Sequence, residues 1–204
     1  MKYRTILLFG APGAGKGTQG KILGAVPGFF HFACGDAFRN MRIVDPIARV
    51  FLDYSSRGQL VPDEPTIEFW HHSIERTIQQ GVFRPDQDWL VLDGMPRNPR
   101  QAEIINDILD VKAVFYFDIP DRAEVVRRIQ RRALRENRLD DINLEVITRR
   151  LDAYECETAP VLAFYGSELV HKIDSLQPAI KVLHDIVQIV IGMQEAFAED
   201  TGAD

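Results

Sequence analysis

The feature that most constrains this chain is a glycine-rich segment, GAPGAGKGT, at residues 10–18. It follows a nearly continuous apolar run at residues 5–9 and precedes a stretch with helical character to about residue 23. Glycines let backbone N–H groups converge on phosphate oxygens, and the N-terminus of the next helix adds its positive end. Lys16 can then reach the outer phosphates of a nucleotide. The order of strand, loop and helix predicts a phosphate-binding loop rather than a tight turn with an incidental lysine.

Apolar runs alternate with helical segments along the whole chain, which predicts an α/β fold with a five-stranded parallel sheet and helices on both faces. The expected strands are residues 5–9, 29–33, 89–92, 113–117 and 169–173. Two stretches, about 34–64 and about 133–142, do not fit the alternation and are candidates for mobile caps over a site. We expect one domain over residues 1–204, with two insertions at these places. The acidic tail, 198–204, is expected to be disordered.

The composition excludes several classes of protein. A net charge of −6 disfavours broad nucleic-acid binding. The two cysteines, Cys34 and Cys156, lack the spacing of a zinc site or a disulfide framework. No segment approaches the roughly 20 apolar residues that span a bilayer. We therefore expect a cytoplasmic monomer with free thiols that binds neither nucleic acid nor membrane.

A second motif, LVLDGMPRNPRQ, occupies residues 90–101 and begins as a buried strand. A carboxylate at the end of such a strand faces the ligand crevice of an open sheet, so Asp93 can hold waters on Mg²⁺. Arg97 can bind a phosphate through two parallel hydrogen bonds. The amide of Gln101 can both donate and accept, which suits the edge of adenine. A strand-end turn and a surface helix residue are the plainer interpretations of Asp93 and Gln101.

Nine arginines fall between residues 122 and 150, together with five acidic residues. Arg128 and Arg132 are four residues apart and so share a helix face, where like charges repel unless they are neutralised. Glu124 and Glu136 are placed to do this, so a solvated, salt-bridged helix face is one interpretation. An RNA-binding patch is a second, although no aromatic platform accompanies it. A nucleotide site is the third.

The motifs together resemble those of adenylate kinases and their nucleoside-monophosphate kinase relatives. The resemblance rests on the phosphate loop with its threonine displaced to Thr18, on CGDAFR at 34–39, on GQLVPD at 58–63, on DGMPR at 93–97 and on a helix bearing RLxxY at 150–154. It covers residues 5–190. The segment at about 34–64 is similar to the family's acceptor-binding insert. The segment at about 133–142 is similar to a short lid with the pattern R-x-D-D, namely Arg138, Asp140 and Asp141.

The resemblance implies a role for each matching residue. The implied ATP-binding residues are Gly13, Ala14, Gly15, Lys16, Gly17, Thr18, Arg128 and Arg132. The implied AMP-binding residues are Cys34, Arg39, Leu60, Val61, Gly94, Arg97, Gln101, Arg138 and Arg150. Lys16, Arg97, Arg132, Arg138 and Arg150 are the implied catalytic residues, and Asp93 holds Mg²⁺ through water. Arg149 is an alternative to Arg150, because one extra residue separates Asp141 from the usual arginine.

The resemblance implies Mg²⁺-dependent phosphoryl transfer, ATP + AMP = 2 ADP. Cys34 departs from the threonine common in adenylate kinases and from the alanine common in pyrimidine kinases, so a UMP/CMP kinase is the alternative. Met95 and Ser175 replace an aromatic residue and a glycine of the family pattern. These departures leave a non-catalytic protein that binds adenine nucleotides as a third hypothesis.

Overall fold

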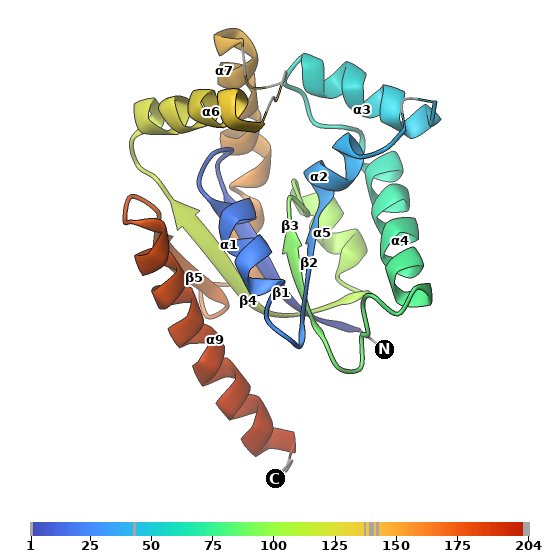
Figure 1. Ribbon diagram of the computed structural model, residues 1–204, viewed down its shortest axis with the longest axis vertical. Coiled ribbons are helices and arrows are strands. Elements are labelled where there is room, and N and C mark those ends of the chain that lie inside the picture. The colour runs from blue at the N-terminus through green and yellow to red at the C-terminus, as the bar shows by residue number, and fades with distance from the viewer. Residues whose placement is uncertain (1, 43, 137, 139–140, 142, 202–204) are drawn as a thin grey trace.

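The computed structural model describes residues 2–42, 44–136, 138, 141 and 143–201, with the backbone alone from residue 196. Five parallel strands form one sheet in the order β2-β3-β1-β4-β5 (Figure 1). The strands are β1 (Tyr3–Gly10), β2 (Phe29–Ala33), β3 (Trp89–Asp93), β4 (Leu109–Asp118) and β5 (Val170–Asp174). The helices are α1 (Lys16–Leu23), α2 (Cys34–Arg39), α3 (Pro46–Ser56), α4 (Asp63–Gln79), α5 (Pro99–Ile105), α6 (Arg122–Glu136), α7 (Leu144–Ala153), the π-helical turn η2 (Tyr154–Thr158), α8 (Val161–Tyr165) and α9 (Ala179–Thr201).

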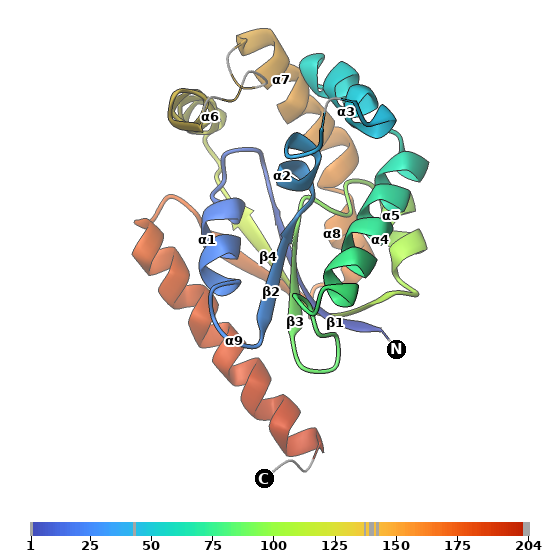
Figure 2. The ribbon, with the colours of Figure 1, turned by 45° about the vertical axis from the view of Figure 1, so that its right-hand side comes forward.

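Helices cover both faces of the sheet, and the alternation of side chains along β1 shows how. Ile6 and Leu8 pack in a cluster that includes residues of α1 and α9. Leu7 and Phe9 point the opposite way, into a cluster with residues of α4, α5 and α8. Figures 1 and 2 show α1 and α9 together on one side of the sheet and α4 and α5 on the other. Because both faces are buried at the centre of the sheet, β1 and β3 contain nearly continuous apolar runs, as the sequence predicts.

The carboxyl ends of the strands meet at one edge of the sheet. Leu8 of β1 and Ala33 of β2 are both in register with Asp93 at the end of β3. The phosphate loop, residues 10–18, leaves β1 at this edge. Helices α2 and α3 rise on one side of the edge and α6 and α7 on the other (Figures 1 and 2). Ligands of open α/β sheets bind at this position.

The predicted fold class and all five strands are confirmed, with local differences. β4 is longer than the expected strand at 113–117 and runs from Leu109 to Asp118. The last helix continues to Thr201, so the disorder predicted from residue 198 is wrong for 198–201, where alanine and glutamate favour helix.

Candidate active site

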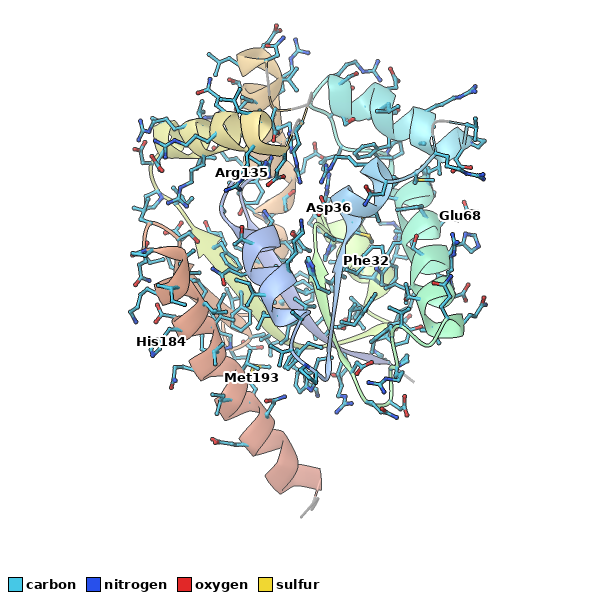
Figure 3. All side chains as sticks on the ribbon, viewed as in Figure 1. Phe32, Asp36, Glu68, Arg135, His184 and Met193 are labelled. Atoms are coloured by element: carbon cyan, nitrogen blue, oxygen red, sulfur yellow. The ribbon has the colours of Figure 1, made fainter. Side chains whose placement is uncertain are left out.

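A cavity of about 850 Å³ lies at the carboxyl edge of the sheet, between the two pairs of helices. Figure 3 shows Asp36 on α2 and Arg135 on α6, which line its two sides. The predicted site residues that line it are Gly13, Ala14, Gly15, Lys16, Gly17, Thr18, Arg39, Leu60, Val61, Asp93, Gly94, Arg97, Arg128, Arg132, Arg138 and Arg150. The fold therefore gathers residues from 13 to 150 of the sequence around one space. Cys34 and Gln101 lie behind its wall.

The phosphate loop has a backbone that requires glycine at two positions. Gly15, the residue before α1, has φ of 102°, in the region that favours glycine. A Cβ added at Gly10 would lie 2.6 Å from the carbonyl oxygen of Phe117 on β4. The loop can pass this close to the neighbouring strand only without a side chain there. The helix α1 then begins at Lys16, so its N-terminus faces the cavity.

Lys16 folds back onto the loop that carries it. Its Nζ donates to the carbonyl oxygens of Gly10, at 2.6 Å, and Ala11, at 3.0 Å. Burial, together with nearby arginines, lowers the pKa of Lys16 to about 8 against the opposing effect of Asp93. These partners are neutral, so a phosphate oxygen in their place would form a stronger, charge-assisted hydrogen bond.

The chemistry around Asp93 fits a magnesium ion that is shared with a nucleotide. A Cβ added at Gly17 would lie 3.5 Å from Oδ2 of Asp93, so the carboxylate rests against the first turn of α1. Within the described residues no group of three or more His, Cys, Asp and Glu side chains is placed to hold a metal. Mg²⁺ commonly keeps several waters and binds through one or two carboxylates plus substrate phosphates. Asp93 beside a phosphate loop meets that requirement.

Two further arginines line the cavity, one on α2 and one just after β3. Nη2 of Arg39 donates to Oδ1 of Asp36 at 2.5 Å, and Nε of Arg97 donates to the carbonyl oxygen of Gly94 at 2.8 Å. Leu60 and Val61 form an apolar wall on the same side. Two guanidinium groups beside an apolar surface match the two parts of a nucleotide, an anionic phosphate and a flat base.

Gln101 and Cys34 are held behind this wall. Gln101 is 0% exposed; its Oε1 accepts from the backbone N–H of Arg97 and its Nε2 donates to Oδ1 of Asp63, both at 2.8 Å. Its amide therefore fixes the protein's own backbone in this conformation, and contact with adenine stays a prediction. Burial raises the pKa of the Cys34 thiol to about 11, so this thiol is uncharged at neutral pH.

Three arginines on α6, on α7 and between these helices are held by carboxylates, and we call them the arginine cluster: Arg132, Arg138 and Arg150. Arg132 and Arg150 both pair with Asp141, whose side chain is fully buried, the first at 2.7 Å. Arg138 reaches across the cavity to Oδ1 of Asp36 at 3.1 Å and also pairs with Glu136. Burial alone would raise the pKa of Asp141, but the hydrogen bond from Arg132 and the charge of Arg150 lower it.

Arg150 and Arg149 differ in position. Arg150 lines the cavity, whereas Arg149 is exposed and pairs with Glu145. Arg128 also lines the cavity and donates to Glu124 and, at 2.8 Å, to the carbonyl oxygen of Ser175. The lid residue Asp140 falls outside the described residues.

Sequence reasoning missed Asp36 and Thr158. Asp36 lies within the CGDAFR motif, where roles were predicted only for Cys34 and Arg39. Burial alone would raise the pKa of Asp36, yet the hydrogen bond and charge of Arg39, with Arg138 and Lys21, lower it. Thr158 follows the RLxxY motif and donates to the carbonyl oxygen of Arg97 at 2.8 Å. No local sequence pattern indicates the contact of Asp36 with Arg138 or that of Thr158 with Arg97, because the partners are 102 and 61 residues apart.

Comparison with known proteins gives a consistent result. Residues 8–170 match the family model described as adenylate kinase. The chain is 37% identical to an adenylate kinase of Thermobifida fusca over 87% of this chain and 93% of the relative. It is 37% identical to one of Cyanothece sp., over 91% and 94%, and 32% identical to one of Parabacteroides distasonis, over 94% and 96%. Among the described residues, none of the helices is both long and apolar enough to cross a membrane.

Proposed function

Since the chain belongs to the adenylate kinase family, and is thus a phosphotransferase, we propose that it catalyses reversible Mg²⁺-dependent transfer of the γ-phosphoryl group of ATP to AMP. One observation carries the proposal. Five cationic side chains from opposite sides of the fold line one cavity, namely Lys16, Arg97, Arg132, Arg138 and Arg150. Phosphoryl transfer needs mainly alignment and charge neutralisation, and this arrangement supplies both.

The proposed mechanism divides these residues between donor and acceptor. The phosphate loop and Lys16 bind the outer phosphates of ATP, and Arg128 with Arg132 lies over the donor nucleotide. Arg39 and Arg97 hold the phosphate of AMP, while Leu60 and Val61 cover its base. Asp93 would hold Mg²⁺ through water, and the ion neutralises charge on the donor phosphates. No general base is required, because the acceptor phosphate oxygen is already ionised at neutral pH.

Exclusion of water is the second requirement, since ATP would otherwise be hydrolysed. We infer that the insert at 34–64 and the lid at 133–142 close over the two nucleotides. The ion pair between Arg138 and Asp36 supports this, because it already joins the lid side to the insert. The free state of both cysteines agrees with a cytoplasmic setting.

AMP is the acceptor that we favour over UMP and CMP. The names of the relatives support it, and the apolar wall at Leu60 and Val61 accommodates a purine. Cys34 is an uncharged, buried thiol and so adds no charge that would repel either base. Retention of all five cations argues against a non-catalytic protein.

A coupled ADP-formation assay with ATP and Mg²⁺ tests the proposal when AMP, UMP, CMP and GMP are offered in parallel. We expect a kcat/KM for AMP well above those for the other acceptors. Preference for UMP or CMP would keep the mechanism and change the acceptor. Clear ATP binding without turnover of any acceptor would refute the enzymatic proposal.

A further inference from the structure

The backbone of Arg97 is held from both sides by side chains of other elements. Oε1 of Gln101, on α5, accepts a hydrogen bond from its N–H at 2.8 Å. Oγ1 of Thr158, on η2, donates to its carbonyl oxygen at 2.8 Å. Thr158 is only 9% exposed, so little water competes for that carbonyl. The direction of the Arg97 side chain therefore depends on where these two neighbours stand.

Thr158 belongs to the same continuous helical segment as Arg150. Helix α7 ends at Ala153 and passes into η2 without a break, as the helical backbone angles of Ala153 and Tyr154 show. The turn is closed by a hydrogen bond over five residues, from the N–H of Ala159 to the carbonyl oxygen of Tyr154, at 2.9 Å. One rigid element thus carries Arg150 on the lid side and the hydroxyl that contacts Arg97 on the acceptor side.

The π-helical turn decides which side chain meets Arg97. In a regular α-helix, a residue seven positions after Arg150 lies about 20° from it around the axis, and one eight positions later lies about 80° away. Glu157 would then face the cavity. A turn closed over five residues advances by a smaller angle per residue, which rotates Thr158 toward the face of Arg150. In the structure Thr158 lines the cavity with Arg150, whereas Glu157 is exposed.

The difference between these two side chains matters chemically. A carboxylate at this place would accept hydrogen bonds, so it could not serve the carbonyl oxygen of Arg97, and its charge would repel an incoming phosphate. A threonine hydroxyl donates to the carbonyl and adds no charge. We propose that Thr158 is a positioning residue for Arg97, placed by the π-helical turn, and that it thereby sets the affinity for the acceptor phosphate. This inference rests on the proposed role of Arg97.

Thr158→Val and Thr158→Ser provide the test. Valine keeps the shape and removes the hydroxyl, which leaves the partly buried carbonyl of Arg97 without this donor, while serine restores the hydroxyl. For Thr158→Val we expect the KM for AMP to rise about five- to tenfold with the KM for ATP nearly unchanged. Thr158→Ser should recover most of the loss. An equal rise in both KM values, or no rise in either, would refute the proposal.

A double-mutant cycle separates positioning from general damage to the fold. AMP affinity is measured by equilibrium dialysis for wild type, Thr158→Val, Arg97→Lys and the double variant. Lysine lacks the planar fork that depends on orientation, so Thr158→Val should have little further effect on top of Arg97→Lys. Fully additive losses would mean that Thr158 does not act through Arg97. Wild-type protein that binds AMP but does not turn it over would contradict the proposed function and leave this cycle interpretable.

Discussion

The phosphate loop and the arginine cluster both present cations to the same cavity, but they are held in different ways. The loop is shaped by its backbone, with glycine required at Gly10 and Gly15, and Lys16 bonds neutral carbonyls. The cluster depends on carboxylates: Asp141 holds two of its arginines and Asp36 the third. The loop is therefore a preformed anion site, and the cluster is a set of charges already satisfied within the protein.

This difference predicts a different role for ligand on each side. A phosphate that displaces carbonyl oxygens from Lys16 exchanges a neutral partner for a charged one, which strengthens the bond. A phosphate that approaches Arg138 must compete with Asp36, which is also an anion. We infer that the loop supplies most of the binding of ATP, and that the cluster changes partners as the nucleotides are enclosed.

The largest expected effect is on the loop. Lys16→Ala should lower kcat/KM about 10²–10³-fold, because a preformed charge on the transferring phosphoryl group is lost. The measurement is the coupled ADP assay, with circular dichroism to confirm the fold. Lys172→Ala is the matched control, since Lys172 is exposed and pairs with Asp118 away from the cavity. Equal activity of the two variants would remove Lys16 from the mechanism.

Arg150→Ala and Arg149→Ala test the cluster through neighbouring residues. Arg150 lines the cavity, so its loss should lower kcat about 10²-fold by removing charge that acts on the transition state. Arg149 pairs with Glu145 on the exposed side, so its loss should change kcat less than about twofold. A large effect of Arg149→Ala would reverse the assignment and the helix register on which it rests.

The same contrast explains what the sequence can predict. The strand, the glycines and Lys16 are neighbours along the chain, so their pattern predicts the loop fully. The pairing of Asp36 with Arg138 joins residues 102 apart and depends on how α2 and α6 pack. The turn η2 has no sequence signal of its own, so the position of Thr158 against Arg97 was not foreseeable. For Gln101 the sequence predicts a polar amide near the acceptor but not its bond to Asp63.

A third prediction asks how far the cluster depends on its carboxylate. Asp141→Asn keeps the shape but leaves Arg132 and Arg150 without that charged partner, so the free energy of unfolding should fall by about 2 kcal/mol. This is less than for a fully buried pair because both arginines keep some exposure. Urea unfolding measures it. Asp152→Asn breaks an exposed pair with Arg122 and should cost under about 1 kcal/mol. Similar losses of unfolding free energy in the two variants would mean that Asp141 stabilises the protein no more than an exposed ion pair does.

The last prediction concerns the pH dependence of the loop, which leaves the native sequence unchanged. Lys16 has a pKa of about 8 in the ligand-free protein, against an ordinary value of 10.5, because burial disfavours its charge. Since kcat/KM reports the free enzyme, its value for ATP should fall above about pH 8, approaching tenfold per pH unit. Bound phosphate favours the charged lysine, so kcat should hold to higher pH.

The stability of the protein is expected to change in the opposite direction over this pH range. This separates loss of the lysine charge from unfolding as the cause of lower activity. Between about pH 8 and 10.5 the unfolded chain binds more protons at Lys16 than the folded protein does, so this residue's contribution to stability rises with pH. A fall in kcat/KM between about pH 8 and 10.5 without a fall in the melting temperature would therefore reflect loss of the charge on Lys16. Lys16→Arg should be less active but should lack the fall, because a guanidinium stays protonated. If kcat/KM of Lys16→Arg still falls above about pH 8, a group other than Lys16 titrates there. ATP binding at the loop would then depend on charges besides that of its own lysine.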